Sequence, residues 1–361
     1  MFDKKNVLIC PLNWGLGHAT RCVPVIQAFV DAGANVIIAG DYGPLAFLRK
    51  EFPDLQSIVF TGFKITYQRK GSFLLKMFSL FPNVVKDIYN EHKQLSNIID
   101  AYKIDVVVSD NRFGLWNKKV KSIFITHQIL IKSPIKIKGF EKILFLCNKA
   151  FIKNYNECWI PDFEGEINLS GDLSHKYKLP IDTYFIGPLS RFVYSQPISE
   201  NKDIDVLVLL SGPEPQRSIF EEIIIKQLEN TNHKVVIVQG IAEKEETRII
   251  SENLIIYSHL ETIALQKLIQ ESAIVVCRSG YSTIMDLAVF GKKAILIPTP
   301  GQTEQEYLAA YYKEKKYFYT TSQKLFNLDE ALMQSALCTG IQMHSDTKIL
   351  RERVQNYLTN N

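Results

Sequence analysis

The clearest candidate for chemistry is a polar turn that follows the apolar run at residues 273–276 and opens a helical pattern. The turn gathers backbone N–H groups, hydroxyls and one guanidinium from Arg278, Ser279, Gly280, Ser282 and Thr283. Such a turn at a helix N-terminus can hold a phosphate group. Asp286 lies about one helical turn later, so its carboxylate should face the same place and suit the two hydroxyls of a ribose. The alternative is an ordinary helix start with an exposed Asp286.

Two other predicted turns, at residues 211–217 and 298–307, place polar groups at the start of a helix. The groups in them that could contact a ligand belong to Ser211, Gly212, Arg217, Gln305 and Glu306. An arginine at a helix N-terminus can contact an anion, and amides or carboxylates can hydrogen-bond sugar hydroxyls. The alternative for both turns is a solvated helix start without a ligand.

The loop between the first predicted strand and the first predicted helix contains Asn13, Gly15, Gly17 and His18. Glycines permit a tight turn and a close approach of the backbone to a ligand. A dinucleotide-binding loop would have a third glycine at position 20, where this sequence has Thr20. An NAD-dependent oxidoreductase is therefore weakly supported, and a plain tight turn is the other alternative.

Three residues near the ends of predicted strands could transfer a proton. His18 is the first candidate, because a neutral imidazole can act as a general base near neutral pH. Asp110 and His127 follow apolar runs and should reach the carboxyl edge of a parallel sheet, where such sheets bind ligands. Structural roles, such as positioning a ligand or capping a helix, are the alternative for all three residues.

The sequence offers no convincing metal site. Asp203 and Asp205 have the D-x-D spacing of some divalent-metal sites, but they precede a predicted strand and so lie at its amino end, away from the ligand-binding edge. The six cysteines include no C-x-x-C pair, which argues against a zinc site. We therefore expect neither a metal ion nor a cofactor.

The elements that must position these residues follow an alternating pattern. Apolar runs of strand length alternate with helical periodicity in the first half of the chain, and the same rhythm restarts at residue 206. Strands that alternate with helices predict parallel sheets, so we expect an α/β protein with two doubly wound, Rossmann-like domains. Prolines and polar residues interrupt the pattern between 185 and 203. We expect domains at 1–190 and 203–344, with a C-terminal helix within 345–361 that can pack back on the first domain.

The composition excludes several classes of protein. The chain has 361 residues, of which 46% are hydrophobic and 22% charged, as in soluble globular proteins and unlike collagen or low-complexity chains. No segment supplies the roughly 20 apolar residues of a membrane span, and the N-terminus lacks the apolar segment of a signal peptide. We therefore expect a cytoplasmic protein with reduced thiols and no nucleic-acid partner.

Positive charge is concentrated in the first half of the chain. Residues 1–186 carry 24 basic and 17 acidic side chains, although the net charge of the whole chain is only +4. Residues 64–86 contain five Lys or Arg and no acid, and residues 132–153 contain six Lys and one acid, both interleaved with apolar side chains. Such stretches could dock on an anionic membrane surface, which would make the protein peripheral on its inner face. The alternative is two core-packing helices with solvated lysines.

Residues 278–310 resemble the C-terminal half of glycosyltransferase family 28, which includes the bacterial cell-wall N-acetylglucosaminyltransferases. The matching residues fall in the family's order and spacing: the run 277–280, Asp286, Gly291, Pro298 and the segment 305–307. The loop that ends in His18 is similar to the family's N-terminal glycine loop, and His127 with Gln128 to its histidine-glutamine strand end. The family usually has Glu where Asp286 stands and Gln where Glu306 stands.

The resemblance implies a GT-B fold, in which two Rossmann-like domains face each other across a cleft. It also implies a donor site in the C-terminal domain, an acceptor site mainly in the N-terminal domain, and no metal requirement. The donor would be a UDP-sugar, with UDP-GlcNAc as the first candidate, and its uracil would lie against the backbone of His259 and Leu260. The acceptor is unknown, and a lipid-linked or membrane-proximal acceptor is one option.

Two other functions are compatible with the same features. A GT-B-fold epimerase would act on a nucleotide sugar without any acceptor. A non-catalytic protein would bind the nucleotide but neither transfer nor hydrolyse the sugar. Candidate polar groups at both domain edges favour transfer over these alternatives.

Overall fold

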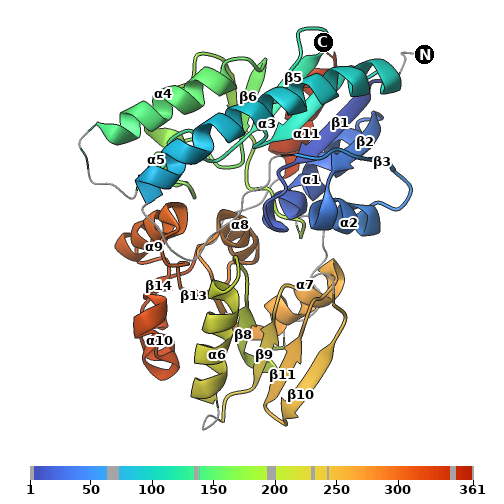
Figure 1. Cartoon of the computed structure of the whole chain (residues 1–361). Helices are drawn as coiled ribbons and strands as arrows, with labels where there is room; N and C mark the ends of the chain where they lie inside the picture. Colours follow the sequence, from blue (N-terminus) through green and yellow to red (C-terminus); the bar gives the residue numbers. More distant parts are fainter. Residues whose placement is uncertain are drawn as a thin grey trace. The chain divides into compact units, whose positions relative to one another are not determined.

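The computed structural model describes residues 4–62, 73–133, 137, 139–192, 201–228, 232–241, 244–341 and 347–359, and the side chains of 73–84 are not described. The chain divides into two compact units (Figure 1). Unit 1 comprises Met1–Ile131, Lys138–Leu189 and Asp346–Asn361, and unit 2 comprises Lys132–Ile137 and Ser190–Ser345. The division at Leu189 lies beside the predicted end of the first domain. No helix among the described residues is both long and apolar enough to cross a membrane.

Unit 1 is built on a seven-stranded sheet in the order β3-β2-β1-β4-β5-β6-β7, in which all neighbouring strands are parallel. The strands are β1 (Asn6–Pro11), β2 (Asn35–Gly40), β3 (Gln56–Val59), β4 (Val106–Asp110), β5 (Lys121–Ile125), β6 (Glu157–Ile160) and β7 (Asp182–Phe185). The helices are α1 (Gly17–Asp31), α2 (Tyr42–Glu51), α3 (Phe73–Tyr102), α4 (Phe140–Ile152), α5 (Asp172–His175) and α11 (Thr347–Thr359). The strand order reverses between β1 and β4, which creates a switch point there.

Unit 2 repeats this plan in the order β10-β11-β9-β8-β12-β13-β14, and only the β10–β11 pair is antiparallel among the strands described. The strands are β8 (Ile204–Leu209), β9 (Val235–Val238), β10 (Thr247–Ser251), β11 (Leu254–Tyr257), β12 (Ser272–Cys277), β13 (Ala294–Leu296) and β14 (Tyr319–Thr320). The helices are α6 (Gln216–Leu228), α7 (Thr262–Glu271), α8 (Tyr281–Phe290), α9 (Thr303–Glu314), α10 (Leu328–Ser335) and the 3₁₀ helix η1 (Gln323–Leu325). Its switch point lies between β8 and β12.

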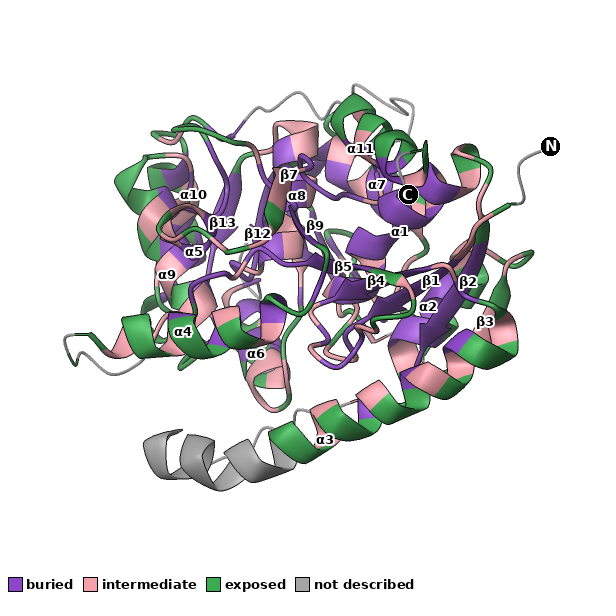
Figure 2. Ribbon diagram, turned by 90° about the horizontal axis from the view of Figure 1, so that it is seen from above, coloured by how far each residue is buried: buried purple, intermediate pink, exposed green. Residues whose placement is uncertain are grey.

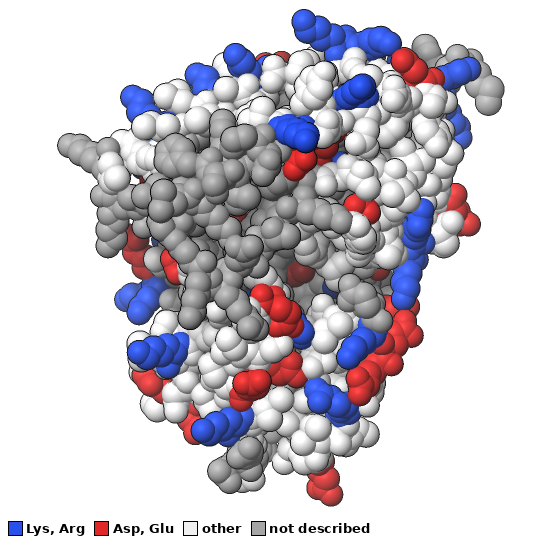
Figure 3. All heavy atoms as spheres, in the orientation of Figure 1, with Lys and Arg blue, Asp and Glu red and all other residues white. Residues whose placement is uncertain are grey.

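The central strands of both sheets are buried, as Figure 2 shows by colour. Parallel sheets are covered on both faces, so their strands are apolar throughout rather than alternating. Val7, Leu8, Ile9 and Cys10 of β1 are accordingly all 0% exposed. The surface is mixed in charge, and Figure 3 shows Lys or Arg interspersed with Asp or Glu over the described part of unit 2 that faces the viewer.

The C-terminal helix packs on unit 1. Tyr357 of α11 contacts Trp159 edge-on, with ring centroids 5.9 Å apart, and the guanidinium of Arg353 lies 3.6 Å from the ring centroid of Tyr184. Arg353 also pairs with Glu157 at the start of β6.

The order and direction of the strands in both sheets confirm the predicted α/β class with two doubly wound, Rossmann-like units.

Candidate active site

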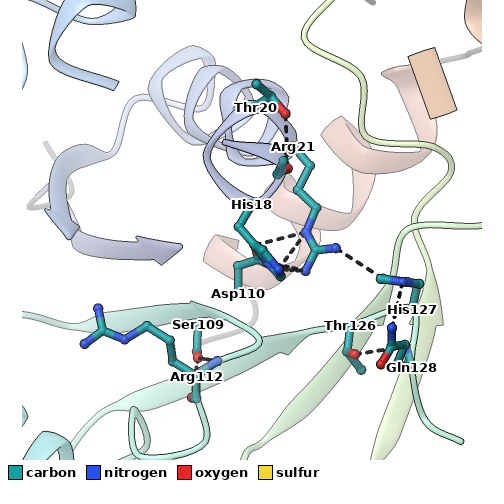
Figure 4. A network of polar contacts seen from close by, with 10 residues as sticks. His18, Thr20, Arg21, Ser109, Asp110, Arg112, Thr126, His127 and Gln128 are labelled. Carbon is teal, nitrogen blue, oxygen red and sulfur yellow. Dashed lines mark hydrogen bonds and ion pairs between the residues drawn. The ribbon is translucent and has the colours of Figure 1, made fainter. Parts of the chain in front are cut away.

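The carboxyl edge of the unit 1 sheet brings together residues that the sequence nominates for proton transfer (Figure 4). β1 and β4 are neighbours, and their register pairs Pro11 with Asp110 at this edge. The loop after β1 leads into α1, whose second residue is His18. Because this edge is also the switch point of the sheet, the fold places His18 and Asp110 where open α/β sheets bind ligands.

Arg21, about one turn further along α1, contacts all three nominated residues. Its Nε donates to the two carboxylate oxygens of Asp110 at 2.8 and 3.0 Å, and its Nη2 donates to Oδ1 as well. Nη2 lies 2.9 Å from Nδ1 of His18, and Nη1 lies 3.2 Å from Nδ1 of His127. Arg21 is 2% exposed and Asp110 is 0% exposed, so the network is buried. The sequence-based prediction does not include Arg21, although its i, i+3 spacing from His18 puts both on one helix face.

The charges in this network favour an ionised Asp110 and a neutral His18. Oδ2 of Asp110 lies 2.9 Å from Nδ1 of His18. Burial opposes ionisation of Asp110, but the attraction of Arg21 and His18 outweighs it and lowers the pKa of this carboxyl. Burial and then the positive charge of Arg21 lower the pKa of His18. A histidine with a lowered pKa is neutral at physiological pH and can accept a proton.

His127 lies directly after β5 and is held from several sides. Its backbone oxygen accepts a hydrogen bond from Oγ of Ser174 at 2.7 Å, and its side chain is almost fully buried. Nε2 of the neighbouring Gln128 lies 3.5 Å from Nε2 of His127, and the Gln128 backbone N–H donates to Oγ1 of Thr126. His127 is therefore a fixed part of the network, and its role in proton transfer stays a prediction.

The glycine loop shapes the surroundings of His18. Gly15 has a φ of +66°, a left-handed backbone conformation that favours glycine. The ring of Trp14 stacks beside the imidazole of His18, with centroids 6.4 Å apart. Asn13 and Gly17 are half-buried in the same segment. The loop has the predicted tight form, and its contact with an acceptor stays a prediction.

In unit 2, Arg278 makes several hydrogen bonds that the sequence-based prediction does not include. Its Nη1 donates to the backbone oxygens of Ile297 and Pro298, at 3.2 and 3.4 Å. Its Nη2 donates to the backbone oxygen of Gln216 at 2.8 Å and to Oε1 of Gln323 at 2.7 Å. Arg278 is 0% exposed. The guanidinium therefore holds together the start of α6, the 3₁₀ helix η1 and the segment after β13, and its contact with a diphosphate stays a prediction.

Gln305 and Glu306 fix the loop that precedes α9. Oε1 of Gln305 accepts from the backbone N–H of Thr299, and the backbone oxygen of Gln305 accepts from Oγ of Ser279, both at 2.8 Å. Oε1 of Glu306 accepts from the backbone N–H of Gly301 at 2.9 Å. These contacts tie the loop to the turn before α8. Direct contact of Gln305 and Glu306 with a sugar stays a prediction.

Thr299 is a candidate ligand contact that the sequence-based prediction does not include. Its side chain is 3% exposed, and its Oγ1 has no hydrogen-bond partner within the described ranges. A Cβ on Gly212, whose φ is +99°, would lie 3.3 Å from this hydroxyl. A buried hydroxyl without a partner is costly unless water or a ligand satisfies it. The signal in the sequence is the position of Thr299 three residues after the end of β13.

The start of α8 retains the features of the predicted anion site. Its N-cap is Gly280, which has no side chain that could cap the helix. Ser279 is buried, while Ser282 and Thr283 in the first turn are half-buried. The first N–H groups of a helix have no partner within the helix, and the helix dipole favours an anion beside them.

Asp286 lies in α8 and contacts the segment that follows unit 1. Its Oδ1 accepts a hydrogen bond from Oγ of Ser190 at 2.6 Å. Burial raises the pKa of Asp286 to about 6, although Arg191 and Ser190 act in the opposite direction. The carboxyl group is therefore mostly ionised at physiological pH and becomes protonated below about pH 6, and its contact with a ribose stays a prediction.

The remaining predicted donor residues lie in loops after β8 and β11. Ser211 and Gly212 are exposed after β8. Arg217 pairs with Glu214 of the same turn, so its charge is partly compensated. His259 and Leu260 are half-buried in the loop between β11 and α7. All of these loops follow the carboxyl ends of strands, where parallel sheets bind ligands.

The D-x-D pair lies at the amino end of β8. Oδ2 of Asp205 accepts a hydrogen bond from the backbone N–H of Lys234 at 2.7 Å. Within the part of the chain that the structure describes, no cluster of three or more His, Cys, Asp or Glu side chains could hold a metal ion.

Comparisons with known proteins show similarity in the sequence of the C-terminal half and in the fold of the chain. Residues 215–345 match the model of the glycosyltransferase family 28 C-terminal domain. One curated relative is the UDP-N-acetylglucosamine–N-acetylmuramyl-(pentapeptide) pyrophosphoryl-undecaprenol N-acetylglucosamine transferase of Sulfurihydrogenibium sp. (strain YO3AOP1), which is 22% identical over 225 residues. The alignment covers 59% of this chain and 61% of that relative.

Solved glycosyltransferase structures share the fold. The crystal structure of Acinetobacter baumannii MurG matches with a TM-score of 0.55, and that of the glycotransferase of kitacinnamycin with a TM-score of 0.67. Each is 12% identical, and each match covers 98% of this chain and 99% of the other. The chain thus has the GT-B fold of these structures, and within it residues 215–345 match the family 28 C-terminal domain.

Proposed function

We propose that the protein transfers a sugar from a UDP-sugar to an acceptor hydroxyl, with UDP-GlcNAc as the first candidate donor. The observation that supports this most is the buried network of His18, Arg21 and Asp110 at the switch point of unit 1, because it supplies a neutral base. The family 28 domain in unit 2 supports binding of a nucleotide sugar.

Unit 2 would bind the donor through groups at the carboxyl edge of its sheet. The start of α8, whose N-cap is Gly280, would receive the diphosphate. The hydroxyl of Thr299, which has no hydrogen-bond partner within the described residues, would donate to or accept from the donor. Asp286 would hold the ribose. Its hydrogen bond from Ser190 would either persist beside the ribose contact or be replaced by it. Arg278 would act indirectly, by holding the loops that carry these groups.

The reaction needs a base and a site that stabilises the leaving group. In an inverting transfer, His18 would take the proton of the acceptor hydroxyl while that oxygen attacks the anomeric carbon and the sugar–phosphate bond breaks. Negative charge then builds on the departing UDP, where preorganised N–H groups of α8 are most effective. Asp110 is less suited as the base because it is 0% exposed and its carboxylate is paired with Arg21.

Release of UDP tests the proposal directly. The protein would be incubated with a panel of UDP-sugars, with and without hydroxyl acceptors, and UDP and sugar products would be measured. Acceptor-dependent release of UDP supports the transferase. Isomerised sugar from UDP-GlcNAc alone would favour an epimerase, and binding without any turnover would favour a non-catalytic nucleotide-binding protein.

We predict that UDP raises the melting temperature and that Asp286→Ala removes most of this rise. Ligand at 100 times its dissociation constant stabilises a protein by about 2.7 kcal/mol, which a thermal-shift assay resolves. The carboxylate form should bind a ribose better than the acid, and burial raises the pKa of Asp286 to about 6. The shift caused by UDP should therefore be smaller at about pH 5 than at about pH 8.

Asp329→Ala is the matched control, because Asp329 is an exposed carboxylate in the first turn of α10, in the same unit. Its UDP-induced shift should equal that of the wild type. Equal shifts in Asp286→Ala and the wild type would remove Asp286 from the donor site.

The acceptor side of the proposal includes an anionic membrane surface. α4 presents Ile143 and Leu146, which are 55% and 49% exposed, beside the exposed Lys142 and Lys153. A helix with exposed apolar and basic side chains suits the interface of an anionic bilayer. In the other predicted stretch, residues 64–72 lie outside the described residues and the side chains of 73–84 are not described.

We predict that the protein sediments with anionic but not with neutral liposomes, and that high salt weakens this binding. Each Lys or Arg near such a surface contributes about 1 kcal/mol, which salt screens. Lys142→Glu combined with Lys153→Glu should release the protein without changing UDP binding. Lys313→Glu in α9 of unit 2 is the control. If the wild type does not sediment with anionic liposomes at low salt, the result would favour a soluble acceptor.

A further inference from the structure

We propose that Arg21 is a positioning residue that gives the two buried histidines opposite tautomers. His127 carries its proton on Nε2, whereas His18 carries its proton on Nδ1 and presents an unprotonated Nε2. Only His18 can then act as the base, while His127 can donate a hydrogen bond. The catalytic meaning of this inference rests on the proposed transferase function, but the tautomers themselves do not.

The tautomer of His127 follows from the chemistry of its partner. Nη1 of Arg21 lies 3.2 Å from Nδ1 of His127. A guanidinium has only donors, so Nδ1 must be the acceptor and the proton of the neutral ring is on Nε2. Nε2 of Gln128 lies 3.5 Å from Nε2 of His127, and rotation of this amide by 180° would present its oxygen to the Nε2–H instead.

The tautomer of His18 follows from the carboxylate beside it. Oδ2 of Asp110 lies 2.9 Å from Nδ1 of His18, and Arg21 keeps Asp110 ionised. An unprotonated Nδ1 would direct its lone pair at a carboxylate oxygen, whereas a protonated Nδ1 donates a charge-assisted hydrogen bond to it. Nη2 of Arg21 also lies 2.9 Å from this Nδ1, but Nη2 donates to Oδ1 of Asp110, and the ionised carboxylate is the stronger partner for Nδ1.

The charge balance of the network keeps His18 neutral. The titratable or charged groups that face one another are Arg21 and His18 from α1, Asp110 from the end of β4, and His127 after β5. Arg21 and Asp110 form one ion pair without net charge. A proton added to His18 would place a second positive charge beside Arg21 in a buried site, which is unfavourable at low dielectric. The neutral ring is the form in which a tautomer can be assigned.

Nitrogen NMR of the whole protein labelled with ¹⁵N-histidine tests the tautomers without any substrate. The signals of His18 and His127 would be identified from the spectra of His18→Gln and His127→Gln. We expect Nδ1–H for His18 and Nε2–H for His127 at neutral pH. The opposite tautomer at either histidine in the wild type would overturn the proposal, whatever the outcome of the transferase assays.

Variants of the ion pair test whether Arg21 sets these tautomers. Arg21→Met leaves Asp110 buried without its partner, so Arg21→Met combined with Asp110→Asn serves as the second variant, since it removes both charges. Both variants should convert His127 to a mixture of tautomers, because its donor is lost. An unchanged Nε2–H signal of His127 in a folded variant would show that Arg21 does not set it.

Arg112 and Glu91 provide a matched control. They form another buried ion pair of unit 1, with Nη2 of Arg112 3.1 Å from Oε1 of Glu91. Arg112→Met combined with Glu91→Gln removes the same kinds of charge and should leave the spectra of His18 and His127 unchanged. A change equal to that in the Arg21 variants would mean that any loss of a buried pair disturbs the histidines.

The turnover assay adds a second readout. In Arg21→Met with Asp110→Asn, kcat should fall on the order of 10²-fold, since the base is no longer oriented, while KM for the UDP-sugar stays unchanged. Arg21→Lys keeps the charge with a single donor group and should recover part of kcat. A fall in kcat and a rise in KM of equal size would indicate general damage to the structure.

Discussion

Replacing His18 with alanine is expected to lower turnover by about 10²–10⁴-fold, which is the usual contribution of a general base. The reason is that no neighbouring group can take its place. Asp110 is fully buried and paired with Arg21, and Nδ1 of His127 faces the guanidinium of Arg21. Affinity for a UDP-sugar should change little, because His18 lies in unit 1 and the donor groups lie in unit 2. Steady-state release of UDP and calorimetric titration of UDP measure the two quantities.

The pH dependence of the wild type checks the same assignment. Burial and Arg21 lower the pKa of His18, and a base works only in its unprotonated form. The kcat/KM for the acceptor should therefore rise with pH below the usual titration range of histidine and be flat at neutral pH and above on the side of the base. A rise of kcat/KM centred well above neutral pH would mean that a group other than His18 acts as the base.

His233→Ala is the control for His18→Ala, because His233 lies before β9 in unit 2, at the amino edge of the sheet, and its nearest acid is Asp205. It should keep the wild-type rate. A near-normal rate in His18→Ala would contradict the role of His18 and direct the search to His127 and Asp110.

The sequence predicts the central strands well because parallel strands at the centre of a sheet are apolar on both faces. Residues 7–10, 206–210 and 273–276 are continuous apolar runs, and all correspond to buried strands of the two sheets. The edge strands β3 (Gln56–Val59) and β10 (Thr247–Ser251) are largely exposed, so they carry no such run and periodicity does not identify them. Strand β14 has only two residues and is defined by its neighbour β13 rather than by its sequence.

Some residues of the candidate site can be predicted from the sequence pattern, and others cannot. The sequence shows that His18, Asp110 and His127 follow strands, and parallel topology brings such positions to one edge. It does not show Arg21 as the centre of the network, since an arginine on a helix is usually solvated and only tertiary structure buries this one. For Arg278 the sequence does not predict the hydrogen bonds within unit 2, because the direction and burial of a long side chain depend on segments distant in sequence.

Replacing Arg278 with lysine is expected to destabilise unit 2 before it affects any ligand. Arginine makes four hydrogen bonds there, to three backbone oxygens and to Gln323, and stacks 4.4 Å from the ring centroid of Phe220. Lysine keeps the charge but cannot reach all four acceptors, and each buried acceptor left without a partner costs about 1–3 kcal/mol. We expect a loss of about 3 kcal/mol, which corresponds to a fall of roughly 6–12 °C in the melting temperature of a domain of this size.

The same variant separates the two roles of Arg278, since a direct ligand of the diphosphate would behave differently. If the guanidinium contacted the diphosphate, Arg278→Lys would retain the melting temperature of the free protein and mainly weaken UDP binding. If the guanidinium holds unit 2 together, the free Arg278→Lys protein melts at a lower temperature than the wild type. UDP binding, measured well below that melting temperature, should then fall only through a displacement of the loop before α9. Arg248→Met is the control, because Arg248 lies in the exposed strand β10 of the same unit and its pair with Glu221 resembles the surface pairs that contribute about 0–1 kcal/mol. An Arg278→Lys protein as stable as the wild type would show that the four hydrogen bonds do not hold unit 2 together.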